Sequence, residues 1–168
     1  MFPMRQLDIY LNDHLAGAMV GVELSRRAAN SNRGTPSGEF LQRLHHEIVE
    51  DRRTLLAVVG ALGVDISPAK PALAWIAEKA GRLKLNGRLR GHSPLSRLIE
   101  LEGLEAGVAA KRSLWQSLAR AFPGDVRLER FDLDELIARA EQQLQGTREQ
   151  RLTAAREALA ADISAPPA

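Results

Sequence analysis

The chain has 168 residues and a mass of 18.4 kDa, which is enough for one domain with a sizeable core and too little for two domains of typical size. It holds no cysteine, which excludes disulfide bonds and thiolate metal sites. Its 23 basic and 21 acidic side chains leave a net charge of only +2, so nucleic acid is not expected as a partner. An apolar fraction of 45% with only 4% aromatic residues favours an all-α fold.

Apolar residues recur at helical spacing in the N-terminal part of the chain and predict two long helices, the first over residues 4–30. The run from Ser31 to Pro36 breaks this pattern, and Ser37 is the expected N-cap of a second helix that Gly63 ends. Because the connection is short, we expect the pair to pack antiparallel. The expected buried stripes are Leu7, Leu11, Leu15, Ala18, Val22 and Ala29, followed by Leu41, Leu44, Ile48, Leu55, Val58 and Leu62.

The longest connection follows, over residues 64–93, and its pattern predicts an extra helix at about residues 71–84 with Trp75 and Ile76 on its apolar side. Residues 82–91 also alternate on both sides of Asn86-Gly87, which is typical of a two-residue β-hairpin. A helix followed by a loop is the favoured interpretation, and the hairpin stays open as the alternative.

A second pair of long helices is predicted in the C-terminal half. Ser93 is the expected cap and Pro94 the first-turn residue of a helix that ends at Phe122-Pro123-Gly124, and the last helix is expected to begin near Asp132. We therefore predict one helical-bundle domain over residues 1–163 and a disordered tail at 164–168. The expected inward residues are Leu101, Leu104, Val108, Trp115 and Ala119, followed by Leu133, Leu136, Ala140, Leu144 and Ala155.

Two antiparallel hairpins joined by one long crossover resemble the ferritin-like four-helix-bundle superfamily, over roughly residues 5–160. Members of that superfamily that bind two irons place a Glu on the first and third helices and Glu-x-x-His on the second and fourth. This chain contains no Glu-x-x-His, so the resemblance implies a bundle without the usual di-iron site. The carboxylates at comparable places are Glu23, Glu102 or Glu105, Glu47-Ile-Val-Glu50 and Glu141.

Three polar residues occupy positions in the predicted apolar stripes where a leucine would be typical: His14, Asp51 and Arg112. At ~1.5 Å per residue, all three fall about two to three turns from one end of the bundle. Because an unpaired buried charge is costly, we predict a buried polar layer in which Asp51 pairs with Arg112 and His14 lies at the margin. Such a layer would fix the helix register, and a catalytic role is the less favoured interpretation.

The same alignment brings Glu23, His45 and Glu105 to a common level, where they form a candidate metal site for Fe or Mn. The competing interpretation is a set of solvated charges at the rim of the helix seams, with Arg148 nearby. A further candidate, an anion-binding patch, lies in the crossover, which carries no acidic residue over 79–92. The competing interpretation of this segment is a solvated basic loop. The basic residues of this patch are Lys79, Arg82, Lys84, Arg88 and Arg90.

The favoured function is therefore that of a non-catalytic structural or protein-interaction bundle, with a protein partner or a second copy of itself and without a cofactor. The alternative is a metal-binding carboxylate bundle that handles iron or performs oxidation chemistry. Neither a cleavable signal nor a membrane span is recognisable in the sequence, so a cytoplasmic location is expected. Phosphate-binding glycine motifs and a nucleophile elbow are also missing from the sequence.

Overall fold

The computed structural model describes residues 6–67 and 93–163, and within these ranges all regular structure is helical. The helices are α1 (Gln6–Ser31), α2 (Pro36–Ala61), α4 (Pro94–Ala121) and α5 (Leu133–Ile163). The predicted all-α class with four long helices is confirmed. The predicted crossover helix, the alternative hairpin, the basic residues at 79–90 and the tail at 164–168 lie outside the described residues.

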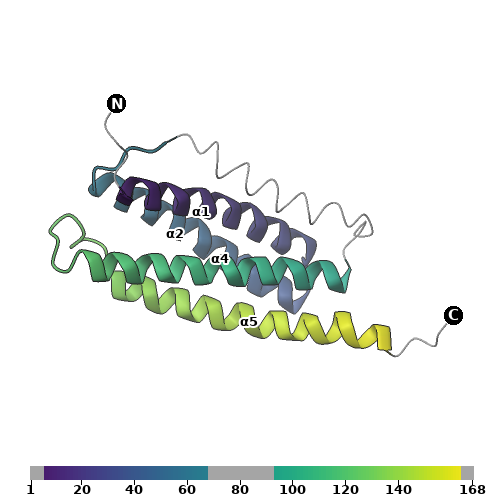
Figure 1. Ribbon diagram of the computed structural model, residues 1–168. Helices are drawn as coiled ribbons and strands as arrows, with labels where there is room; N and C mark the ends of the chain where they lie inside the picture. The colour runs from purple at the N-terminus through teal and green to yellow at the C-terminus, as the bar shows by residue number, and fades with distance from the viewer. Residues whose placement is uncertain (1–5, 68–92, 164–168) are drawn as a thin grey trace.

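The four helices lie side by side along one direction, as Figure 1 shows. Contacts join α1 to α2 and α4, and α5 to α4 and α2, so within the described residues α1 lies diagonally opposite α5. The contacts between α1 and α2 run in reverse chain order, because Asn12 bonds to the carbonyl of Asp65 whereas Ser25 bonds to His45. This ring leaves a central space that only side chains can fill.

The turn between α1 and α2 is built from polar side chains and a glycine. Thr35 is the N-cap of α2, with extended backbone angles (φ −114°, ψ 158°), and its Oγ1 accepts a hydrogen bond from the N–H of Gly38 at 3.0 Å. The prediction that Ser37 is the cap is therefore wrong by two residues. Pro36 lacks an N–H and so fits the first helical position, which Thr35 must then precede. Ser37 instead donates to Gln150 on α5 at 2.8 Å.

The other helix ends follow the predicted signals. Gly63 adopts a positive φ of 66° just after α2, and Gly124 adopts a φ of 70° just after α4. Ser93 caps α4, its Oγ accepting from the N–H of Ser96 at 3.1 Å, with Pro94 in the first turn as expected. Side-chain Oδ1 of Asp132 accepts from the N–H of Glu135 at 2.9 Å and so begins α5.

The apolar core forms two clusters along the bundle. One contains Trp115 of α4 and Val58 of α2. The other contains Leu101 of α4 and Leu41 of α2. Between the two clusters, α2 carries Asp51 instead of an apolar residue, and the polar interior lies at this level.

Candidate functional site

Asp51 is the centre of the polar interior. Its side chain on α2 is only 3% exposed, and both carboxylate oxygens accept hydrogen bonds. Oδ1 accepts from the guanidinium of Arg139 on α5, and Oδ2 accepts from Nζ of Lys111 on α4 and from the amide of Gln143 on α5 at 3.2 Å. A buried carboxylate with several donors, two of them cationic, meets the requirement that a buried charge be paired and hydrogen-bonded.

Gln143 and Glu47 extend this arrangement into what we call the Asp51 cluster: Glu47, Asp51, Lys111, Arg139 and Gln143. The Gln143 amide donates to Glu47 at 2.8 Å, and its oxygen accepts from Lys111. Two carboxylates thus face two cations. Burial lowers the pKa of Lys111, and the neighbouring charge of Asp51 opposes this shift. The cluster links α2, α4 and α5, and its charged side chains pair with other members of the cluster.

The predicted layer of His14, Asp51 and Arg112 is only partly found. Asp51 is buried, but its cationic partners are Lys111 and Arg139, so the predicted pairing with Arg112 is wrong. Successive residues of a helix point about 100° apart, and Lys111 rather than Arg112 therefore faces α2. Arg112 lies in a shallow groove between α4 and α5 with Glu105 and Arg148. His14 makes an edge-to-face contact with Tyr10, with ring centroids 4.6 Å apart.

The candidate metal ligands Glu23, His45 and Glu105 each engage a different partner. Glu23 is exposed and pairs with Arg26 at 2.7 Å, and that hydrogen bond lowers the pKa of its carboxyl. Glu105 pairs with Arg148 at 3.2 Å and with Arg151. Across residues 6–67 and 93–163, no group of three or more His, Asp or Glu side chains is arranged to hold a metal ion. The geometry therefore does not bring these three residues together as ligands.

His45 contacts a serine, which sequence reasoning did not anticipate. Nδ1 of His45 lies 2.9 Å from Oγ of the buried Ser25, and that hydroxyl donates to the carbonyl of Val22 at 3.0 Å. Nδ1 and Oγ share one hydrogen bond between α1 and α2. Burial lowers the pKa of His45. The pair thus joins α1 to α2.

A cavity of about 250 Å³ lies between α1, α2 and α4. Glycines line it on both sides of the α1–α4 seam: Gly17 and Gly21 on α1, and Gly103 and Gly107 on α4. Within the described part of the chain, no atom lies within 4 Å of the Cβ that a residue other than glycine would carry at position 17 or 107. The apolar side chains of its wall include Ala18, Ile48, Leu55, Leu104, Val108 and Leu114.

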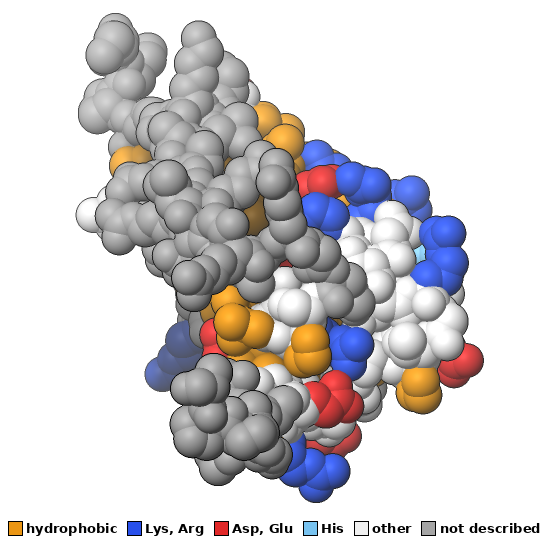
Figure 2. Space-filling view, turned by 90° about the vertical axis from the view of Figure 1, so that its right-hand side faces the viewer, with side chains coloured by type: hydrophobic (Ala, Val, Ile, Leu, Met, Phe, Trp, Pro, Cys, Tyr) orange, Lys and Arg blue, Asp and Glu red, His pale blue; other side chains and the backbone are white. Residues whose placement is uncertain are grey.

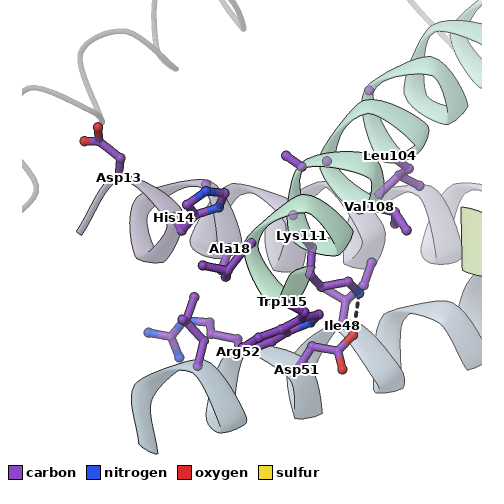
Figure 3. A pocket seen from close by; sticks show the side chains of 17 residues that line it. Asp13, His14, Ala18, Ile48, Asp51, Arg52, Leu104, Val108, Lys111 and Trp115 are labelled. Atoms are coloured by element: carbon purple, nitrogen blue, oxygen red, sulfur yellow. Dashed lines mark hydrogen bonds and ion pairs between the residues drawn. The ribbon is translucent and has the colours of Figure 1, made fainter. Parts of the chain in front are cut away.

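Polar groups border this cavity at one level, as Figure 3 shows: Asp51 and Lys111 lie on one side of the Trp115 indole and Arg52 on the other. Trp115 is 1% exposed, and among the described residues no acceptor lies within hydrogen-bonding distance of its Nε1. His14 also lines the cavity. Burial lowers the pKa of His14, and the neighbouring Asp13 partly offsets this. Of the predicted layer, His14 and Asp51 thus share one cavity.

Sequence reasoning missed Lys111, Arg139, Gln143 and the cavity. The sequence did contain one signal for Gln143. It lies with Thr147 on the helix face of α5 that also carries Leu136 and Ala140, and both polar residues are buried there. Nothing local marks Lys111 or Arg139, because long basic side chains reach inward from the edge of a helix face.

Comparison with protein-family models, with curated proteins and with solved structures finds no match to this chain. None of the described helices is long and apolar enough to cross a membrane.

Figure 2 shows the end of the bundle that faces right in Figure 1, where basic side chains are spaced along one margin with acidic side chains among them.

Proposed function

We propose that this chain is a non-catalytic bundle of the ferritin-like type that acts by protein contact, with a second copy of itself as the partner. The observation that carries the proposal is the closure of the Asp51 cluster. Both oxygens of Asp51 accept from side chains of the cluster, and Lys111 and Arg139 are directed at that carboxylate. Charges consumed in this way are not available as metal ligands or as a general acid and base.

The order of helix contacts supports the ferritin-like arrangement. Arg97 near the start of α4 pairs with Glu157 near the end of α5 at 2.8 Å, whereas Lys111 further along α4 meets Gln143. Two antiparallel hairpins, α1–α2 and α4–α5, account for this order, and residues 62–93 join them. The order of the four described helices thus supports the resemblance to ferritin-like bundles.

The outer face of α5 supports contact with a partner. Leu152 and Leu159 are each 55% exposed, although other leucines of the same helix, such as Leu136 and Leu144, are buried. Seven residues make nearly two helical turns, so Leu152 and Leu159 lie on one face. A second copy of the chain would present the same pair, and a two-fold interface is the most common way in which such a face is buried.

Sedimentation velocity over a wide range of protein concentration tests this proposal. We expect a reversible dimer for the unmodified chain and a monomer for the variant carrying Leu152→Glu and Leu159→Glu, because a buried unpaired carboxylate opposes association. Val126→Glu is the matched control, since Val126 is 76% exposed but lies in the connection between α4 and α5. A chain that stays monomeric at every concentration would refute self-association.

Elemental analysis distinguishes this proposal from the metal-dependent alternative. After anaerobic loading with Fe(II) and exposure to air, we expect no stoichiometric metal, because Glu23, His45 and Glu105 are each engaged elsewhere. Stoichiometric iron or manganese that disappears in Glu105→Ala would replace the proposal with an iron-handling bundle.

A further inference from the structure

We infer that the cavity between α1, α2 and α4 binds a small carboxylate with an apolar body, and that Trp115 and Arg52 recognise its carboxylate. This inference is independent of the proposed self-association, because none of the residues that line the cavity belongs to α5. Three observations support it: the volume and apolar wall of the cavity, the buried N–H of Trp115 without an acceptor, and the guanidinium of Arg52 without a partner among the described residues.

The volume of the cavity sets the size of the ligand. An engineered apolar cavity of about 150 Å³ in another protein holds a benzene molecule, so about 250 Å³ accommodates a ligand of about ten non-hydrogen atoms. The wall formed by Ile48, Leu104 and Val108 is apolar, and a Cβ added at Gly17 or Gly107 would meet no described atom within 4 Å. An unbranched or singly ringed hydrocarbon body fits such a space.

Trp115 supplies the unused donor. Its indole is almost fully buried and lines the cavity, and within the described residues its Nε1–H has no acceptor. A buried N–H without an acceptor costs free energy that a ligand oxygen recovers on binding. A hydrocarbon alone would leave this donor unsatisfied, so the ligand should carry an acceptor.

The charges around the cavity favour an anionic acceptor. Both oxygens of Asp51 are already occupied, and Lys111 uses two of its three N–H groups on Asp51 and Gln143. Arg52 is half-buried beside Trp115, and no ion pair or hydrogen bond joins its guanidinium to another described residue. Asp13 also borders the cavity, but it is exposed and points away from Trp115 in Figure 3. A carboxylate that accepts from Nε1 of Trp115 would also be attracted by the guanidinium of Arg52, which lines the same cavity.

Isothermal titration calorimetry with octanoate and octanol tests the inference. We expect one saturable site for octanoate and binding at least about tenfold weaker for octanol, which has nearly the same apolar body but no charge. Trp115→Phe should weaken octanoate about tenfold and octanol by less, because a charged carboxylate is a stronger acceptor for the lost N–H than a hydroxyl oxygen. Arg52→Gln should also weaken octanoate selectively, and since Arg52 lies at the margin of the cavity, this variant tests recognition even if Trp115→Phe unfolds.

A cavity-filling variant locates the site. Gly107→Leu places a side chain in the cavity and should abolish binding of both probes, whereas Gly60→Leu, on an exposed face of α2 outside the cavity, should bind as the unmodified chain does. Equal affinity for octanoate and octanol would overturn the carboxylate assignment. The absence of binding by either probe to the folded protein would overturn the ligand site as a whole, and it would leave the self-association measurement unaffected.

Discussion

At the scale of single residues, the Asp51 cluster sets the largest energetic constraint. Removing one member of a buried ion pair leaves the other members charged and less well paired, and the resulting penalty exceeds the net stability that the pair contributes. Lys111 and Arg139 both depend on Asp51, whereas Arg112 has no part in the cluster. Asp51 and Arg112 are therefore expected to respond very differently to substitution.

Asp51→Leu should lower the free energy of unfolding by about 3–5 kcal/mol, because it leaves two cations facing an apolar side chain. Arg112→Leu should change it by less than about 1 kcal/mol, since Arg112 lies in the shallow groove between α4 and α5. Urea denaturation followed by circular dichroism measures both. A loss in Asp51→Leu no larger than that in Arg112→Leu would contradict the assigned pairing.

His14 should make the stability of the bundle depend on pH. Burial lowers its pKa in the folded state below the ordinary value of 6.5, and Asp13 only partly offsets this. The unfolded chain therefore takes up a proton first as the pH falls, so the contribution of His14 is fully present above about 6.5 and is lost at lower pH. His14→Gln should reduce the slope of unfolding free energy between about pH 7 and pH 5.

The unmodified chain is the reference for this measurement, and His45, whose pKa burial also lowers, stays in place in both proteins. An unchanged slope in His14→Gln would show that the folded state does not resist protonation of this imidazole.

At the scale of secondary-structure elements, the turn between α1 and α2 is tightly built. Asn32 is buried and donates to the carbonyl of Ala28 at 2.8 Å, while its own carbonyl accepts from Oγ1 of Thr35 at 2.7 Å. The backbone of Asn32 passes so close to α2 that a Cβ at Gly38 would lie 2.0 Å from its oxygen. Only glycine fits at this position without a shift of backbone.

Gly38→Ala should therefore destabilise the protein by about 1–3 kcal/mol, the usual cost of overpacking. Gly60→Ala, on the same helix, should instead stabilise it by about 0.5–1 kcal/mol, because no described atom lies within 4 Å of the new Cβ and alanine is the better helix former. Thermal or urea unfolding of the two variants compares them directly. Equal effects would mean that the turn can move away from α2.

At the scale of the whole molecule, two apolar clusters share four continuous helices. Each helix contributes residues to both clusters, for example Leu15 and Ala29 from α1, and Leu114 and Leu101 from α4. The Asp51 cluster lies between them and ties α2 to α4 and α5. Since no helix belongs to one cluster alone, neither cluster can unfold while the other keeps its packing.

We therefore predict one cooperative unfolding transition. Leu118→Ala in the first cluster and Leu44→Ala in the second should each cost about 2–5 kcal/mol and shift the whole transition. Far-ultraviolet circular dichroism and Trp115 fluorescence, recorded in a Trp75→Phe background, should give coincident curves. Fluorescence that changes before helicity is lost, in Leu118→Ala only, would show that the clusters unfold independently.

Local patterns in the sequence determined the helices of this protein. The 3.6-residue period of leucine and alanine, the Ser93-Pro94 start of α4 and the glycines at 63 and 124 each act within one or two turns, so they can be read without knowing the fold. The burial of Asp51 followed from the same periodicity, because a residue between Ile48 and Leu55 on one helix face shares their environment. The error at the start of α2 was local too, since Thr35 and Ser37 are both good caps and Pro36 decides between them.

Only the tertiary structure decided which side chains meet. Asp51 is 60 residues from Lys111 and 88 from Arg139, and the choice of Lys111 over Arg112 depends on a rotation of α4 that periodicity leaves uncertain by about one residue. The cavity has the same origin, because glycines on α1 and α4 become a hollow only when the two helices face each other. A helix sets its own apolar face through local spacing, but the angle at which it turns that face toward its neighbours is fixed by packing against all of them at once.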